Sequence, residues 1–456
     1  MPDYGSEVRS KTISAEKAAE LVEPGMWLDL GGANAQPDLF DKALAARVPQ
    51  LSDLRVRSVL TVRPLAILEA DPDGAHVQLY SWHFSGLDRM QHDAGRCIYI
   101  PLNLGEVPDY YRRFVHQPDI AVIRTAPADD QGIFNFGPTN VWLGALLERA
   151  RIVIVETSPS IPYVHGAKNG VHVSDVDHVI EGKDIGLAEL GNPEATDIDR
   201  AVANQIATEV EDGSCIQIGI GGMPNAACAL LAESGVRDLG VHTEMLTDGI
   251  IDLVNAGCVT GAKKQLDPGK VVFTFALGSN AMYEALADNP VYQCEPVDYT
   301  NLPHIIMQND KVVSINNTTQ MDLQGQACSE TNGHRHLTGT GGQLQFVRGA
   351  YASKGGKSFM LLSSTYERKG IRKSRIVLNL TAGNVVTTPR SDTMYVVTEY
   401  GMTNLKGKSV SERARALISL AHPDYREELE REAYEHGLIP VSYTHLTLPT
   451  INGVCG

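Results

Sequence analysis

Short apolar runs alternate with amphipathic segments along most of the chain. Residues 26–30 and 214–218 are rich in apolar side chains, which is typical of buried strands. Residues 15–23 and 225–234 place apolar side chains at helical spacing and are predicted helices. This alternation predicts an α/β protein with parallel sheets that carry helices on both faces. We expect further strands at residues 97–100, 120–124, 151–156, 239–242, 270–278, 312–316, 375–380 and 394–399, and further helices at 38–47, 139–149, 197–211 and 409–421.

The strand and glycine turn at residues 210–219 have a counterpart near the N-terminus. Residues 22–25 match residues 210–213, and residues 28–31 match residues 216–219, at a constant spacing of 188 residues. Either the match arises by chance among common turn residues, or the chain contains two similarly folded halves. The second interpretation predicts two similar open α/β domains, with the active site in the cleft between them.

The segment 190–196, with the sequence LGNPEAT, is the best linker candidate, because Gly and Pro interrupt the regular patterns there. We therefore predict an N-terminal domain at residues 1–195 and a C-terminal domain at residues 196–440. Residues 441–456 have no periodic apolar face. We expect this tail to be disordered or foreign to the protein and to carry no function.

Composition excludes several classes of partner. The 456 residues carry a formal net charge of −16, so no broad basic field exists to neutralise a nucleic acid or an anionic membrane. The seven cysteines include no C-x-x-C pair, so the sequence indicates neither a disulfide framework nor a zinc site. The sequence contains no apolar run of about 18 residues, so it predicts no membrane span. We expect a cytoplasmic protein without a metal.

The stretch around residues 214–248 carries the clearest chemical signal. A strand at 214–218 leads into the glycine turn GIGGMP, a helix follows, and a second strand at 239–242 runs into Glu244. Ligands bind at this edge of an open α/β sheet, so Glu244 is the candidate for chemistry. The same outline fits a nicotinamide dinucleotide site, but Pro224 and Asn225 stand where the third glycine is needed. A structural turn with a solvated Glu244 is the remaining alternative.

The basic run at residues 368–375 is the one local positive patch of note. It is interpreted either as a solvated loop or, with less weight, as a phosphate clamp.

Six motifs, taken together and in this order, resemble the acetyl-CoA hydrolase/transferase family of glutamate-dependent CoA-transferases. The resemblance covers the chain from about Ser14 to Ile439 and is close to the branch of butyryl-CoA:acetate and 4-hydroxybutyrate CoA-transferases. The motifs are GIGGMP at 219–224, HTEMLTDG at 242–249, INNTTQMDLQG at 315–325, GTGGQLQFVRGA at 339–350, TEYG at 398–401 and AHPD at 421–424. One departure is Gln345, where the family often has Asp.

The resemblance implies roles for individual residues. Glu244 is expected to be the covalent nucleophile, with the amide of Ile220 placed to serve an oxyanion. Asn301 resembles a polar active-site position, and Thr318 a CoA contact. The remaining residues that the resemblance assigns to the CoA site are Gly219, Gly221, Gly222, Met223, Gly341 and Gly342.

The resemblance further implies CoA transfer from a short-chain acyl-CoA, with butyryl-CoA favoured, to a free acid such as acetate through a glutamyl-CoA thioester. Coenzyme A enters as part of the substrate, and no prosthetic group is expected. We expect the protein to form a homo-oligomer. The alternatives are a 4-hydroxybutyrate or propionate CoA-transferase, an acyl-CoA hydrolase, and a nucleotide-binding module without catalysis.

Overall fold

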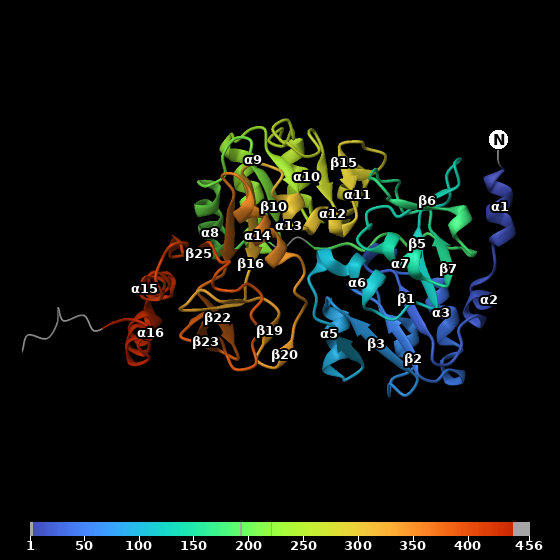
Figure 1. The fold of residues 1–456 in the computed structure, drawn as a ribbon, viewed down its shortest axis with the longest axis horizontal. Helices are drawn as coiled ribbons and strands as arrows, with labels where there is room; N and C mark the ends of the chain where they lie inside the picture. The colour runs from blue at the N-terminus through green and yellow to red at the C-terminus, as the bar shows by residue number, and fades with distance from the viewer. Residues whose placement is uncertain (1–2, 192–193, 220, 441–456) are drawn as a thin grey trace, which may run out of the picture.

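A computed structural model describes residues 3–191, 194–219 and 221–440, which form two domains side by side along the long axis (Figure 1). Each domain is built on a parallel sheet, as the alternation of apolar and amphipathic segments predicts. The tail predicted at residues 441–456 lies outside the described residues.

The first domain contains a seven-stranded sheet in which every pair of neighbours is parallel. In spatial order its strands are β4 (Cys97–Tyr99), β3 (Val77–Ser81), β2 (Leu54–Arg57), β1 (Trp27–Leu30), β5 (Ile120–Thr125), β7 (Ile152–Thr157) and β9 (His178–Glu181). A separate antiparallel pair joins β6 (Ile133–Asn135) and β8 (Gly170–His172).

The second domain contains an eight-stranded sheet that is parallel except for its last pair. In spatial order its strands are β15 (Tyr292–Cys294), β13 (Val271–Phe273), β11 (Gly240–His242), β10 (Cys215–Ile218), β16 (Val312–Asn317), β21 (Lys357–Leu361), β25 (Tyr395–Thr398) and β26 (Gly401–Asn404).

The two sheets share one strand order over their first seven strands. In each sheet the first strand of the domain is central, the next three follow on one side and the remaining three on the other. The 188-residue spacing places β1 on β10, both of which are first strands. The interpretation as two similarly folded halves is therefore confirmed. The division predicted at residues 195 and 196 falls between β9 and the first helix of the second domain and stays a prediction.

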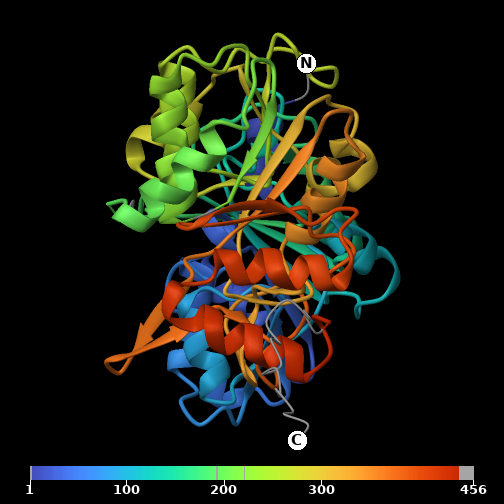
Figure 2. The same cartoon turned by 90° about the vertical axis from the view of Figure 1, so that its left-hand side faces the viewer.

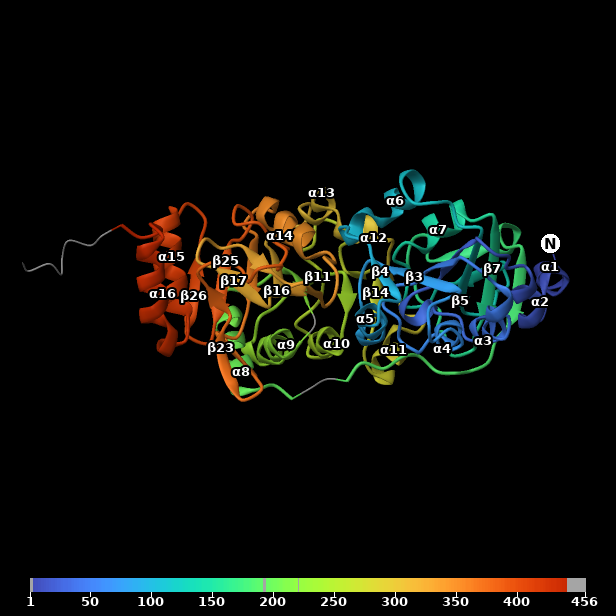
Figure 3. The same cartoon turned by 90° about the horizontal axis from the view of Figure 1, so that it is seen from below.

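Helices cover both faces of each sheet, as Figure 3 shows for α14 and for α8 to α10 on opposite sides of the second sheet. The helices of the first domain are α1 (Tyr4–Lys11), α2 (Ala15–Glu20), α3 (Leu39–Ala45), α4 (Ala66–Glu69), α5 (Gly86–Asp93), α6 (Val107–Arg113) and α7 (Leu143–Arg149). Those of the second are α8 (Asp197–Ala207), α9 (Gly222–Ser234), α10 (Asp248–Asn255), α11 (Asn280–Leu286), α12 (Val297–Asn301), α13 (Pro303–Ile306), α14 (Gln343–Ala352), α15 (Val410–Leu420) and α16 (Pro423–Glu435).

The single strand expected at residues 270–278 is wrong. The chain breaks at Thr274 into β13 and a short strand β14 (Phe275–Ala276), which leaves the main sheet and pairs with β12 (Met245–Leu246). Met245 and Phe275 are buried in the hydrophobic core of the first domain. The apolar run is thus continuous because it spans two cores, which a local pattern cannot distinguish from one long strand.

The strand expected at residues 375–380 is also shorter, as β24 (Ile376–Val377), and it lies in a small sheet with β17 (Gln320–Asp322) and β18 (Ala327–Cys328). The basic run forms most of an antiparallel hairpin, β22 (Thr365–Arg368) with β23 (Ile371–Ser374). This hairpin projects from the molecule in Figure 2. A second hairpin joins β19 (Thr331–Asn332) and β20 (Arg335–His336).

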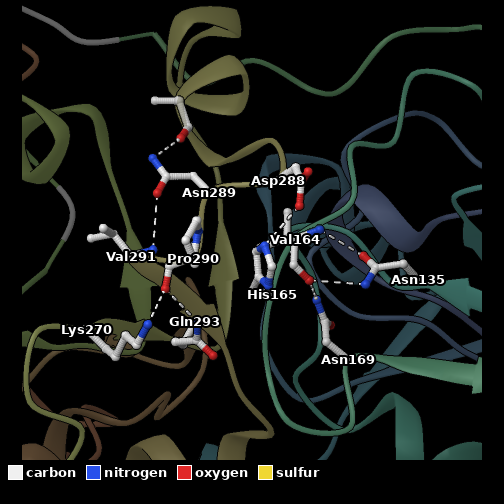
Figure 4. A network of polar contacts seen from close by, with 11 residues as sticks. Asn135, Val164, His165, Asn169, Lys270, Asp288, Asn289, Pro290, Val291 and Gln293 are labelled. Carbon is white, nitrogen blue, oxygen red and sulfur yellow. Dashed lines mark hydrogen bonds and ion pairs between the residues drawn. The ribbon is translucent and has the colours of Figure 1, made fainter.

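Backbone groups connect the two domains at several points. Figure 4 shows the loop that carries Val164 and His165 beside the segment that leads into β15. His165 contacts Asp288 at 3.0 Å, and its carbonyl oxygen accepts a hydrogen bond from the amide of Cys294 at 2.7 Å. Asn135 holds this loop in the first domain through the amide and the carbonyl of Val164, each at 3.1 Å. Defined hydrogen bonds therefore join this loop of the first domain to the second domain.

Candidate active site

Glu244 lies where two strands leave the second sheet. β11 ends at His242, and the β12–β14 pair then turns toward the first domain. The carbonyl oxygen of Glu244 accepts hydrogen bonds from the amides of Thr274 at 3.0 Å and Phe275 at 3.3 Å. These bonds fix the backbone at the divergence point. The Glu244 side chain consequently lines a cavity between the two domains.

Two donors contact the Glu244 carboxyl group. Nδ2 of Asn301 lies 2.5 Å from Oε2 of Glu244, and the backbone amide of Gly342 donates a second hydrogen bond. Burial raises the pKa of Glu244 to about 7, while both hydrogen bonds act in the opposite direction. At neutral pH, a carboxyl group with this pKa is about half ionised and half protonated.

The glycine turn at residues 339–342 has no room for a side chain at Gly342. A Cβ on Gly342 would collide with Oε2 of Glu244 and Nδ2 of Asn301. Gly341 has a φ of +57°, and its carbonyl oxygen accepts a hydrogen bond from the amide of Leu104 in the first domain at 3.0 Å. The turn therefore approaches Glu244 closely while the first domain holds it in place.

The turn after β10 lies on the same side of the second sheet. Gly219 lines the cavity, and Gly221 has a φ of +130°. A Cβ on Gly222 would lie 2.7 Å from a carboxylate oxygen of Asp199. Met223 is buried in the core of the second domain. The predicted oxyanion residue Ile220 lies outside the described residues.

The structure brings Glu244, Asn301, Gly341 and Gly342 together but does not place Thr318 with them. Thr318 is 6% exposed, and its hydroxyl donates to the carbonyl of Cys328 at 2.8 Å. It is not among the described residues that line the cavity. Its neighbours Asn316 and Asn317 do line the cavity.

The cavity has an apolar side and a polar side. The apolar side chains come from both domains and include Leu60, Leu104, Met245, Phe275, Leu277 and Phe346. The polar side chains are those of His83, Gln217, Asn316, Asn317, Ser329, Thr338, Thr340 and Gln343. No Arg or Lys is among the described residues that line it, so Glu244 is the one acidic or basic side chain there apart from His83.

Sequence reasoning placed the active site between the domains but named no residue of the first domain there, above all not His83. Its Nε2 lies 2.9 Å from the hydroxyl of Thr338, and burial lowers its pKa to about 4, so the ring is neutral. A Cβ on Gly341 would lie within 3.8 Å of both the His83 ring and the Glu244 carboxyl group. His83 follows the end of β3, which is the position where ligands meet a parallel sheet, and that signal was available.

Gln345, noted as a departure from the family pattern, connects the domains. Its Oε1 accepts a hydrogen bond from the amide of Gly105 at 2.9 Å, and both residues are buried. A Cβ on Gly105 would lie 2.8 Å from both Asn301 Cβ and Gln345 Nε2. The long amide side chain therefore fills the space beside Asn301 and holds the first domain against it.

Two structural searches cover only the described part of the chain. Within it, no His, Cys, Asp and Glu side chains gather in a group of three that could hold a metal ion. None of its helices combines the length and the apolar character needed to cross a bilayer.

Comparison with known proteins gives matches over nearly the whole chain. Residues 2–188 and 278–433 match the N-terminal and C-terminal domains of acetyl-CoA hydrolase/transferase proteins. A butyryl-CoA:acetate CoA-transferase from Anaerostipes caccae is 43% identical over 94% of this chain and 97% of that protein. A 4-hydroxybutyrate coenzyme A transferase from Clostridium kluyveri is 36% identical over 93% of this chain and 97% of that protein.

Solved structures agree with this assignment. The crystal structure of RipA from Yersinia pestis superimposes with a TM-score of 0.88 at 38% identity, over 96% of this chain and 100% of that one. The 4-hydroxybutyrate CoA-transferase from Porphyromonas gingivalis gives a TM-score of 0.79 at 32% identity, over 95% of this chain and 100% of that one. The chain therefore belongs to the acetyl-CoA hydrolase/transferase family and is a CoA-transferase.

Proposed function

We propose that the protein transfers CoA between butyryl-CoA, or a closely similar short-chain acyl-CoA, and acetate. The observation that carries the proposal is the Glu244 carboxyl group, which faces a largely apolar cavity while Asn301 and Gly342 donate to it. The 43% identity to the butyryl-CoA:acetate CoA-transferase from Anaerostipes caccae supports the choice of substrates.

In this proposal Glu244 is the nucleophile. One of its carboxylate oxygens attacks the thioester carbon of the acyl-CoA, the carbon–sulfur bond breaks, CoA leaves as a thiolate, and a mixed anhydride between Glu244 and the acyl group remains. The thiolate then attacks the Glu244 carbonyl carbon and releases the acyl group as a carboxylate, which leaves a glutamyl-CoA thioester. Acetate attacks this thioester, and the same steps in reverse order form acetyl-CoA.

The two hydrogen-bond donors can stabilise the step in which the CoA thiolate attacks Glu244. When the thiolate attacks Glu244, negative charge develops on a carboxyl oxygen that Asn301 and the Gly342 amide already contact. One donor of this kind is typically worth about 3–4 kcal/mol in the barrier. The raised pKa of Glu244 also favours attack, because a more basic carboxylate is a stronger nucleophile once it is ionised.

The remaining sequence-based roles fit around this chemistry. We propose that Gly219, Gly221 and Gly222 border the CoA path, with Gly341 on its opposite side. The Met223 side chain has no support as a CoA contact, because it is buried in the core of the second domain and is not among the described residues that line the cavity. Thr318 has no support as a direct CoA contact, since its hydroxyl is bonded to the Cys328 carbonyl.

The cavity lining supports an uncharged acyl group. Leu60, Met245, Phe275 and Leu277 would surround a short aliphatic chain, and burying each methylene contributes about 0.8 kcal/mol. Because no Arg or Lys is among the described lining residues, a second carboxylate on the acyl group would lack a partner. Butyryl-CoA is therefore favoured over a dicarboxylic acyl-CoA such as succinyl-CoA.

The proposal is tested by measuring exchange for a matrix of acyl-CoA thioesters against free acids. Butyryl-CoA with acetate is expected to give ping-pong kinetics. Incubation with butyryl-CoA alone, followed by borohydride reduction and mass spectrometry, should reveal the modified peptide that contains Glu244. CoA release that does not depend on acetate would instead identify an acyl-CoA hydrolase, and a matrix led by succinyl-CoA would overturn the substrate assignment.

A further inference from the structure

His242 is a buried histidine close to Glu244 that the proposed chemistry does not use. It is 1% exposed, and its Nε2 lies 2.9 Å from the carbonyl oxygen of Thr300. Its Nδ1 is buried and has no hydrogen-bond partner among the described residues. A carbonyl oxygen can only accept, so the proton is on Nε2 and Nδ1 carries a lone pair. A buried acceptor without a partner lowers the stability of the protein. The hydrogen bond from Nε2 to Thr300 is therefore the contact for which a histidine is needed at this position.

The carbonyl of Thr300 needs a donor from elsewhere. Thr300 lies in the last turn of α12, where carbonyl groups have no partner within the helix. Pro303 follows closely and has no backbone N–H to offer. The imidazole of His242 supplies the missing donor from the neighbouring strand β11.

Thr300 in turn orients Asn301. The Thr300 hydroxyl donates to Oδ1 of Asn301 at 2.8 Å. With the amide oxygen held on that side, the amide nitrogen faces Glu244 and donates to Oε2 at 2.5 Å. The chain of contacts therefore runs from His242 through Thr300 and Asn301 to the candidate nucleophile.

We propose that His242 is a positioning residue, which fixes the end of α12 so that Asn301 keeps its hydrogen bond to Glu244 during CoA transfer. The consequence for catalysis rests on the proposed function. The structural part, that His242 maintains the Asn301–Glu244 hydrogen bond, stands on the contacts alone.

Burial, with a smaller effect of one neighbouring charge, keeps His242 neutral. Burial, and then the nearby Lys264 ammonium group, lower the pKa of His242 to about 3. Lys264 is itself held by the carbonyls of Val241 at 3.0 Å and Lys270 at 2.8 Å. The Tyr299 ring lies 6.3 Å from the His242 ring, and burial raises the pKa of its hydroxyl.

On the other side of the chain of contacts, the group that faces Glu244 is His83, whose pKa is lowered to about 4. Glu244 is therefore the member of this set whose charge changes near neutral pH. Near neutral pH, the titration of the Glu244 carboxyl group is therefore not overlaid by a charge change on either histidine.

The test compares His242→Leu with His242→Gln. Leucine removes the donor, whereas the glutamine amide nitrogen has the same reach from the backbone as Nε2. For His242→Leu we expect the pKa of Glu244 to rise by about one unit and glutamyl-thioester formation at pH 7 to slow about tenfold, with KM for butyryl-CoA changed less than about twofold. For His242→Gln we expect recovery to within about threefold of the wild-type rate.

Val241→Ala is the matched control. Val241 lies on the same strand and packs in the core of the second domain, so its truncation lowers stability without touching Thr300. If His242→Leu does not fold, His242→Asn replaces it, because the shorter amide falls short of the Thr300 carbonyl. Three outcomes would each overturn the proposal. The pKa of Glu244 could stay at its wild-type value in His242→Leu or His242→Asn, His242→Gln could behave like His242→Leu, or Val241→Ala could shift the pKa of Glu244 by the same amount.

The titration is followed by NMR of ¹³C-labelled glutamate carboxyl groups, with Glu244 assigned from Glu244→Gln. This readout needs no substrate. A wild-type protein that forms no thioester would refute the proposed function, while the carboxyl titration would still decide whether His242 maintains the Asn301–Glu244 hydrogen bond.

Discussion

The amide nitrogen of Asn301 lies 2.5 Å from Oε2 of Glu244, although 57 residues separate the two in the sequence. Asn301 is fully buried at the end of α12, and Glu244 follows β11. The contact holds one carboxyl oxygen against a neutral donor, while burial keeps the pKa of the carboxyl group near 7. This balance between burial and hydrogen bonding leads to the predictions below.

Glu244→Gln should form no covalent adduct with butyryl-CoA and should lose exchange activity by at least about a thousandfold, because an amide cannot form the anhydride. Mass spectrometry after borohydride reduction and a CoA exchange assay measure the two effects. Glu295→Gln is the matched control, since burial also raises the pKa of Glu295 to about 7 and Glu295 is not among the described residues that line the cavity. Retention of full exchange activity in Glu244→Gln would remove Glu244 from the mechanism.

Asn301→Ala should raise the pKa of Glu244 above about 7, because it removes a hydrogen bond that lowers this pKa. A smaller fraction of Glu244 is then ionised at pH 7, so the rising limb of the rate profile should move to higher pH by about one unit. The rate at the optimum should also fall about a hundredfold through loss of the donor. Single-turnover thioester formation between pH 5 and 9 measures both effects. An unchanged limb would contradict the assigned contact.

Glu244→Gln should also change how stability depends on pH. Glu244 has a reference pKa of 4.5 and a folded-state pKa of about 7, so the folded state retains its proton in this window while the unfolded state loses it. Glu244 therefore contributes a loss of stability on the order of 2–3 kcal/mol as pH rises from about 4.5 to 7, and Glu244→Gln lacks this contribution. Thermal unfolding of both proteins should agree at pH 4.5 and diverge by pH 8. If the stabilities of the two proteins changed with pH in parallel, the raised pKa of the buried Glu244 carboxyl group would be refuted.

Gly342→Ala should abolish thioester formation while the protein stays folded. The new Cβ would collide with the Glu244 carboxyl group and the Asn301 amide, so one of them must move. Gly144→Ala is the control, because Gly144 lies in α7 and a Cβ there meets nothing within 4 Å. Circular dichroism and the exchange assay measure fold and activity. An active Gly342→Ala would show that the turn is not held against Glu244.

Leu277→Ala should shift preference toward longer acyl chains. Leu277 lines the cavity and is only partly buried, so its truncation enlarges the space next to the acyl group at modest cost in stability. The ratio of kcat/KM for hexanoyl-CoA over butyryl-CoA should rise about tenfold. Leu286→Ala is the control: Leu286 is buried in α11 and is not among the described lining residues, so the variant should be less stable with an unchanged ratio. An unchanged ratio in Leu277→Ala would place the acyl group elsewhere.

The sequence by itself determined the elements and their repetition. The apolar period of residues 214–218 and the glycines after it predicted β10 and its turn, because the side-chain period of a strand and the backbone conformation of a tight turn are local properties of the sequence. The spacing of 188 residues predicted two similar domains, and the position of Glu244 just after β11 identified it as the candidate for chemistry. Its role as the nucleophile came from the family resemblance. The resemblance to the family, rather than periodicity, supplied the family assignment and marked Asn301 as a polar active-site position.

Only the tertiary structure decided what surrounds Glu244. The run 270–278 divides at Thr274 because β14 pairs with β12 and enters the core of the first domain, and no local pattern records which core an apolar side chain joins. Leu60, His83 and Leu104 reach the cavity from the first domain through packing between the domains. The raised pKa of Glu244 follows from that packing, since burial is a property of the assembled domains and not of any segment.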